Sequence, residues 1–269
     1  MKSIIKAVLT ACALGATIYN IVLRGTTIIF VFSLLLCSSA LACRPLTVDD
    51  CPPTERGKVG LESGLTSTRS TGTDYLSGIT TVKYGLLDNL DIGVDLPYLR
   101  YIPAGGTAVS GPGDASVKAK IAVIPSTDHF AGLSFTAGAK LNTGDTAQGL
   151  GSGATDYSFN SILTKEWTRF ALHLNLGYTL TGQTAGQNLR NVVNYGCAFE
   201  TALAAGTKLL GEVYGATNSD PASAVNPLAA TLGANKEVLP GLTADVGWSV
   251  GLNDAAPNRI LTVGLTGTI

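Results

Sequence analysis

Two histidines are the residues of this chain most suited to acid–base or nucleophilic chemistry. An imidazole can take a proton from a neighbouring hydroxyl and create a nucleophile, as in Ser–His hydrolases. Of His129 and His173, only His173 falls in a regular segment that could position it. The sequence has no Gly-x-Ser-x-Gly motif, and Asn175, two residues on, matches no triad motif. We therefore interpret His173 as a hydrogen-bonding residue and keep a lipid-acting hydrolase as an alternative.

Metal and phosphate chemistry find no support in the spacing of the acidic and glycine residues. Asp91 and Asp95 lie four positions apart on one expected strand, which separates them by about 13 Å at ~3.3 Å per residue. That separation is too large for both carboxylates to bind one ion. The glycine-rich stretch 149–153 lacks the lysine of a phosphate-binding loop. The sequence predicts neither a metal ion nor another cofactor.

The composition excludes two classes of protein. Only 14% of residues are charged, with 18 Lys+Arg against 19 Asp+Glu, whereas a soluble domain carries about a quarter. No Lys/Arg cluster provides the basic face that nucleic acids require. Hydrophobic residues reach 45%, yet after residue 43 no window of about 20 residues is apolar enough for a spanning helix. A nucleic-acid partner and a helical membrane protein are therefore not expected.

The first 42 residues have the features of a secretory signal. Lys2 and Lys6 precede one apolar stretch, Arg24 precedes a second, and small residues at Ala40 and Ala42 suit a cleavage site. We predict a signal peptide over 1–42, with an uncleaved anchor helix as the alternative.

A short periplasmic segment is expected at 43–56, ahead of the regular part of the chain. Cys43 and Cys51 lie eight residues apart and could form a disulfide in an oxidising compartment. The alternative is that Cys43 is the lipidated first residue of the mature protein. Cys197 lies in an expected strand and is interpreted as an inert apolar side chain.

From residue 57 to 269 the chain repeats segments of about ten residues in which apolar and polar positions alternate. In 170–181, leucines and aromatic residues occupy the even positions, while His173, Asn175 and Thr179 are among the odd ones. Twelve such segments begin near residues 57, 74, 89, 114, 130, 155, 169, 190, 207, 227, 241 and 258. One face suits lipid and the other water, and in hydrocarbon an open sheet edge is not allowed. The pattern predicts an all-β fold: a transmembrane antiparallel up-and-down β-barrel of about 12 strands.

Short and long connections alternate along this region. Short turns occur near 87–89, 125–128, 165–168, 204–207 and 236–241, and longer stretches near 101–113, 143–154, 182–188 and 218–226. Outer-membrane barrels have short periplasmic turns and longer external loops. We therefore expect a bacterial outer-membrane protein with both termini in the periplasm.

Alternation also predicts which polar residues face the lumen. A lysine or arginine facing lipid at the bilayer midplane costs roughly 2–4 kcal/mol, so charged groups should point inward. The predicted lumen-lining residues are Glu62, Asp91, Asp95, Lys118, Lys120, Lys140, His173, Asn175, Glu200, Glu212 and Asp245. With six acids against three bases, they favour cations slightly if they filter solutes. The other interpretation is a paired network that fills a narrow barrel.

Several motifs resemble a family of Gram-negative outer-membrane proteins named for a MetA pathway of phenol degradation and often labelled transporters. The matching pieces include 44–50, 57–62, 84–86, 113–114, 140–145, 173–178 and 211–215, in the expected order. The chain departs from the pattern at Cys43 and Cys51, and at Asn142, where the family has proline. The resemblance implies an outer-membrane barrel that passes small, often aromatic or hydrophobic, compounds.

The sequence therefore predicts a monomeric channel in the lipid bilayer that passes a small-molecule solute and catalyses no reaction. Two alternatives stay open: an outer-membrane enzyme acting on lipids through His173, and a structural barrel with no open pore.

Overall fold

The computed structural model describes residues 44–70, 73–102, 106–204 and 206–269. The predicted signal peptide at 1–42 lies outside the described residues, as does Cys43 with its predicted disulfide or lipid. In the described ranges, no helix is long and apolar enough to cross a membrane.

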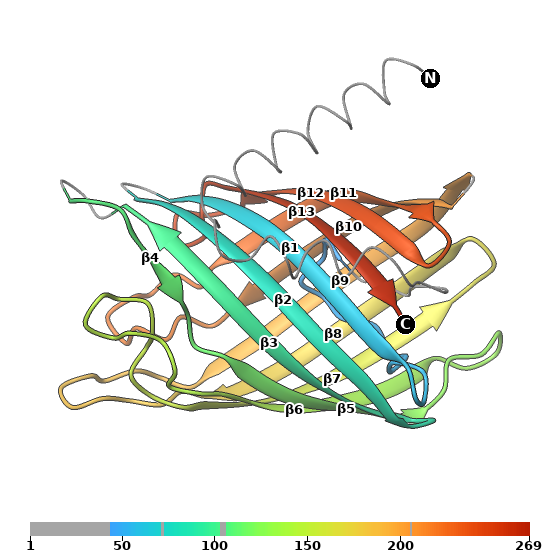
Figure 1. Ribbon diagram of the computed structural model, residues 1–269, viewed down its shortest axis with the longest axis horizontal. Coiled ribbons are helices and arrows are strands. Elements are labelled where there is room, and N and C mark those ends of the chain that lie inside the picture. The colour runs from blue at the N-terminus through green and yellow to red at the C-terminus, as the bar shows by residue number, and fades with distance from the viewer. Residues whose placement is uncertain (1–43, 71–72, 103–105, 205) are drawn as a thin grey trace, which may run out of the picture. The chain divides into compact units, whose positions relative to one another are not determined.

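The described chain forms one closed antiparallel sheet (Figure 1). Each strand pairs with its neighbours in sequence, and β1 pairs with β13 to close the barrel. β4 and β5 both pair with β3 and act as one interrupted strand, so the barrel has the twelve strands that were predicted. The strands are β1 Val59–Ser70, β2 Thr73–Leu87, β3 Leu90–Tyr101, β4 Val109–Pro112, β5 Ser116–Ile124, β6 Gly132–Lys140, β7 Asp156–Glu166, β8 Phe170–Leu180, β9 Val192–Ala204, β10 Thr207–Ala216, β11 Leu228–Leu239, β12 Leu242–Gly251 and β13 Arg259–Thr268.

The barrel is apolar outside and polar inside, the reverse of a soluble domain. β8 shows the alternation clearly: Leu174 and Leu176 on the outer face are 41% and 59% exposed, whereas His173 on the inner face is 2% exposed. The same split repeats in β3, where Ile92, Val94 and Leu96 point outward. Successive side chains of a strand point to opposite faces, so the two-residue period of the sequence produces both surfaces. The outer surface suits hydrocarbon, and closure pairs the backbone groups that an open edge would expose.

The two ends of the barrel differ in their connections. At one end, here called the turn end, short turns join β2 to β3, β7 to β8, β9 to β10 and β11 to β12. Both ends of the barrel sequence meet there, since Val59 N–H donates to Ile269 O at 2.7 Å. The opposite loop end carries the longer connections at 141–155, 181–191 and 217–227. One expectation was wrong in detail: the stretch 101–113 is not all loop, because β4 extends the wall there by pairing with β3.

Candidate functional site

The lumen is lined by the charged side chains of the strands. Of the predicted lumen residues, six are buried, and all six are hydrophilic: Asp91, Lys120, His173, Glu200, Glu212 and Asp245. Glu62, Asp95, Lys118, Lys140 and Asn175 are half-buried. Their sequence neighbours on the strands are mostly exposed apolar residues, which places these polar groups on the inner face.

Most of these charges lie in ion pairs across neighbouring strands. Lys83 binds Glu62, and Lys118 Nζ lies 3.1 Å from Asp95 Oδ1. Further pairs at 2.7 Å are Lys140–Asp156 and Lys208–Glu200.

Several partners were missed by the sequence reasoning, among them Lys83, Asp156 and Lys208. Alternation could have found Lys83, because Val82 and Tyr84 on either side of it are exposed. It could also have found Lys208, which has the same parity along β10 as Glu212. With these three residues counted, seven acids face five bases, so the acids of the lumen still outnumber its bases.

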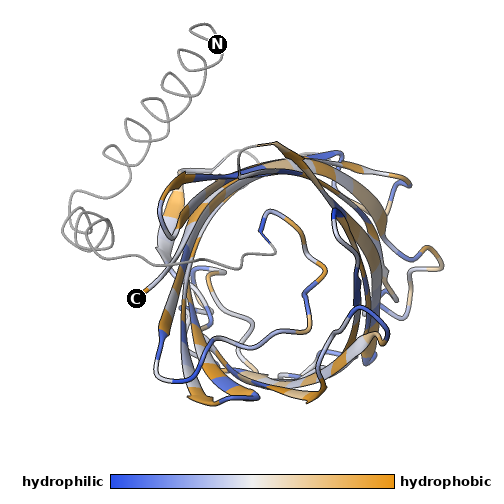
Figure 2. Cartoon of the chain, turned by 90° about the vertical axis from the view of Figure 1, so that its right-hand side faces the viewer, coloured by the Kyte–Doolittle hydropathy of each residue, from blue (hydrophilic) through white to orange (hydrophobic). Residues whose placement is uncertain are grey.

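The N-terminal segment, residues 44–56, lies inside the barrel (Figure 2). It starts beside two acidic residues of the wall, Asp245 and Glu212. Arg44 Nε lies 3.3 Å from Asp245 Oδ2 on β12. The Glu212 carboxylate on β10 accepts hydrogen bonds from the backbone N–H groups of Thr47, at 2.8 and 3.0 Å, and Val48, at 2.9 Å. A buried carboxylate of the wall therefore holds the backbone of the segment directly.

The segment then crosses to the opposite wall. Cys51 N–H donates to Thr164 Oγ1 on β7 at 3.0 Å, and Ser134 Oγ on β6 donates to Cys51 O at 2.6 Å. The Cys51 thiol is free and buried, with Sγ 3.2 Å from Ile162 O. Thr54 N–H donates to Asp91 Oδ2 on β3 at 2.7 Å as the segment leaves toward β1.

Two acids in the middle of the segment meet the basic side of the wall. Lys120 Nζ lies 2.9 Å from Asp49 Oδ1 and 3.4 Å from Asp50 Oδ1. Burial raises the pKa of Asp49, but attraction to Lys120, Lys83 and Lys118 outweighs it and holds that pKa well below its usual range. With its amide oriented to suit its neighbours, Asn175 accepts from Asp49 N at 2.7 Å and donates to Asp49 O at 3.0 Å.

Glycines on the inner face make room for the segment. A Cβ on Gly196 would lie 2.5 Å from Val48 Cγ2. A Cβ on Gly233 would lie 2.6 Å from Pro45 Cγ, and one on Gly247 would lie 2.8 Å from the same ring. Any larger residue at these places would push the segment away from the wall, so the strands are shaped to carry it.

His173 lies between Thr164 and Glu200, a set of residue types that resembles a catalytic triad. Its Nδ1 is 2.9 Å from Thr164 Oγ1, and its Nε2 is 3.9 Å from Glu200 Oε1. Thr164 is fully buried beneath Cys51, whose N–H already donates to its hydroxyl. Because both groups lie on the lumen side under the segment, lipid substrate has no access to this hydroxyl. The geometry suits a structural hydrogen bond between His173 and Thr164 that supports the segment, since the 3.9 Å from Nε2 to Glu200 is too long for a second one.

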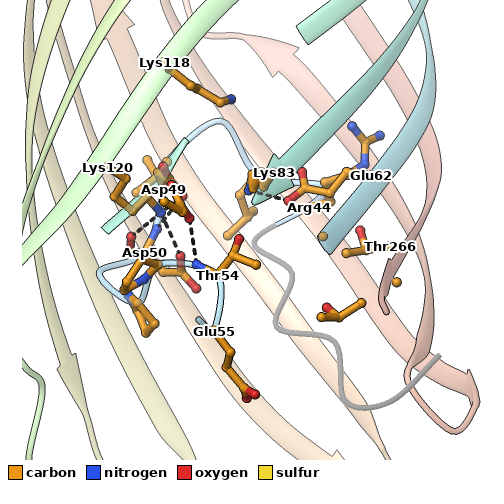
Figure 3. Close-up of a pocket in the computed structure, with 18 of the residues that line it drawn as sticks. Arg44, Asp49, Asp50, Thr54, Glu55, Glu62, Lys83, Lys118, Lys120 and Thr266 are labelled. Atoms are coloured by element: carbon orange, nitrogen blue, oxygen red, sulfur yellow. Dashed lines mark hydrogen bonds and ion pairs between the residues drawn. The ribbon is translucent and has the colours of Figure 1, made fainter. Parts of the chain in front are cut away.

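A polar cavity of about 220 Å³ lies between the N-terminal segment and the wall (Figure 3). Lys83, Lys118, Lys120, Glu62 and Asp91 line it from the strands, and Arg44, Leu46 to Asp50 and Pro52 to Glu55 line it from the segment. Within the described residues, no group of three or more His, Cys, Asp or Glu side chains is placed to hold a metal ion.

Closed wall, apolar outer surface and charged lumen together define a transmembrane β-barrel whose lumen is crossed by its own N-terminal segment. A family model described as "Putative MetA-pathway of phenol degradation" matches residues 48–268. The chain belongs to that family, as its sequence motifs predicted.

Solved structures of other barrels share this fold. The COG4313 outer membrane channel from Pseudomonas putida F1 is 14% identical with a TM-score of 0.66, and the match covers 83% of this chain and 100% of the channel. The NanC porin is 9% identical with a TM-score of 0.55, covering 78% of this chain and 98% of the porin. The KdgM porin, solved with disordered oligogalacturonate, is 5% identical with a TM-score of 0.53 and the same coverage. No curated protein sequence matches the chain. At these identities the likeness concerns the fold.

Proposed function

We propose that this protein is an outer-membrane channel for small solutes, a monomer with both termini in the periplasm and no enzymatic activity. The observation that carries the proposal is the lumen: a closed barrel with buried charged groups on its inner face and a polar cavity beside the N-terminal segment. Charged groups inside a membrane-spanning structure mark the path of polar solutes, because they are costly to keep away from water.

The structural likenesses support this proposal. The most similar structures reported above are named as an outer membrane channel and two porins. The leader at 1–42 would supply the export that an outer-membrane location needs, and the clustering of short turns beside both termini supports their periplasmic placement.

The lumen also refines the expected solute. The family name points to phenol degradation, and the family resemblance implied hydrophobic or aromatic compounds. The residues that line this cavity are mostly charged or polar, with Leu46, Val48, Pro52 and Pro53 as the larger apolar exceptions. We therefore propose small aromatic or aliphatic compounds that carry a polar or ionised group, rather than hydrocarbons.

Conductance of the purified full chain in planar lipid bilayers tests the channel. We expect discrete ohmic steps, small because the N-terminal segment narrows the lumen. A matched experiment in liposomes measures swelling with isotonic small solutes. Electrically silent bilayers together with liposomes that do not swell would refute the proposal and favour a barrel with no open pore.

A further inference from the structure

Three lysines converge on one side of the cavity. Lys83 of β2 and Lys118 of β5 are both register partners of Gly93 on the strand between them. A Cβ on Gly93 would lie 3.3 Å from Lys118 Cε and 3.5 Å from Lys83 Cγ, so the two side chains pack over the glycine from either side. Lys120 follows on the same face of β5, buried in the wall. A residue without a side chain thus lets the stems of two lysines pack side by side, next to a third lysine on the same face.

Lys83 and Lys118 use only part of their hydrogen-bonding capacity. An ammonium group carries three donors. Within the described part of the chain, Glu62 is the ion-pair partner of Lys83 and Asp95 is the ion-pair partner of Lys118. The Lys118 side chain remains 37% exposed although it lies inside the barrel. Both lysines therefore have donors to offer an anion in the cavity.

The protein already places one carboxylate of its own beside Lys83, Lys118 and Lys120, here called the lysine row. Asp49 of the N-terminal segment contacts Lys120, and its lowered pKa reflects attraction to Lys120, Lys83 and Lys118 together. This carboxylate shows that an anion beside the row is stabilised despite burial.

The acidic residues that line the cavity near the lysines already have partners, among them Asp49 and Asp50, which contact Lys120. Asp91 accepts from Thr54 N–H at 2.7 Å, and Glu62 binds Lys83. Glu55 points away from the lysines (Figure 3). An incoming anion therefore meets ammonium donors on the strand side.

Size and the remaining lining restrict the body of such an anion. A cavity of about 220 Å³ exceeds the roughly 150 Å³ that accommodates benzene in an apolar protein interior. Leu46, Pro52 and Pro53 give the segment side an apolar surface against which a ring or short alkyl chain can pack. An anion with one carboxylate and a small apolar body matches the lysines on the strand side of the cavity and the apolar residues on its segment side.

We propose that this cavity is a binding subsite for small organic monocarboxylates, with the carboxylate held by Lys118 and Lys83 and the apolar body against Leu46, Pro52 and Pro53. The inference deepens the proposed channel function by naming its solute class. The N-terminal segment narrows the pore where it faces the lysine row, and the subsite lies at this point. A carboxylate would therefore pause there during passage.

Binding of benzoate to the purified full chain in detergent micelles, measured by ligand-observed NMR, tests the subsite without requiring conduction. Lys118→Gln should raise the dissociation constant for benzoate about tenfold, as expected for the loss of one charged hydrogen bond. Lys140→Gln is the matched control, because it removes one lumen lysine that does not line the cavity, and it should leave binding unchanged. Benzamide, which has the same ring without the charge, should bind more weakly than benzoate. Circular dichroism verifies that each variant keeps the barrel.

The outcomes separate the subsite from the channel. Equal benzoate binding by the parent and a folded Lys118→Gln variant, or equal binding of benzamide and benzoate, would overturn the subsite even if the protein conducts ions. Silent bilayers with benzoate binding that depends on Lys118 would overturn the channel and leave the subsite in place.

Discussion

Glu212 should control how firmly the N-terminal segment is docked. Its buried carboxylate accepts from Thr47 N–H, Val48 N–H and the Thr231 hydroxyl at 2.8 to 3.0 Å. Hydrogen bonds to charged groups contribute about 1.5–3 kcal/mol each. In Glu212→Gln the negative charge is lost and one acceptor oxygen becomes a donor NH₂, so the hydrogen bonds from the Thr47 and Val48 N–H groups become weaker neutral ones and Thr47 N–H loses one of its two acceptor oxygens. We expect docking to weaken by about 2–3 kcal/mol, which is roughly a 30- to 150-fold increase in the undocked population.

The buried thiol of Cys51 provides the assay. It is 2% exposed while the segment is docked, so a charged thiol reagent reaches it only after undocking. In a Cys43→Ser, Cys197→Ala background, the labelling rate follows the undocked population as long as redocking is faster than labelling. Glu212→Gln should therefore label roughly 30 to 150 times faster. Glu166→Gln makes the same substitution at an exposed residue of β7 and serves as the control.

The reasoning would be refuted by one clear result. If Glu212→Gln keeps the circular dichroism of the parent barrel and Cys51 labels at the parental rate, the carboxylate does not hold the segment.

Three further predictions follow from the same geometry. Gly196→Ala places a methyl group against Val48 and should raise the Cys51 labelling rate roughly tenfold, since overpacking costs about 1–3 kcal/mol. Gly78→Ala is the control: its methyl group meets the flexible end of the Leu65 side chain at 3.3 Å, so the labelling rate should not change. His173→Ala should leave the lipid composition of expressing cells unchanged but lower the melting temperature of the barrel, because Thr164 loses a buried partner; altered lipids would revive the hydrolase alternative. The pKa of Asp49 is lowered in the docked segment, so the contribution of this carboxylate to docking is complete above the ordinary pKa of about 3.9 and is lost only as pH falls through the lower folded value. Bilayer conductance should therefore stay constant from about pH 7 to pH 4. A rise in conductance within that window would contradict this reasoning.

Much of the barrel could be predicted because its rule is local. A strand turns alternate side chains to opposite faces, so Phe170 to Leu180 reveals its lipid and lumen sides without any long-range contact. The same parity placed Glu212 and Asp245 inside, and applied to every strand it would also have found Lys83 and Lys208. What it could not provide was pairing: Asp95 meets Lys118, and Lys140 meets Asp156, only because neighbouring strands align in one register.

The sequence alone determined the family, the twelve strands and the inward direction of the charges, because each depends on motifs or on a two-residue period. Only the tertiary structure decided the path of the N-terminal segment, which has no periodicity of its own. Arg44 meets Asp245, 201 positions away, and Thr47 meets Glu212, 165 positions away. These partners come within reach only when β13 pairs with β1 and closes the wall around the segment. The lysine row and its cavity exist for the same reason: closure creates an enclosed interior in which charged residues that are distant in the sequence come within reach of one another.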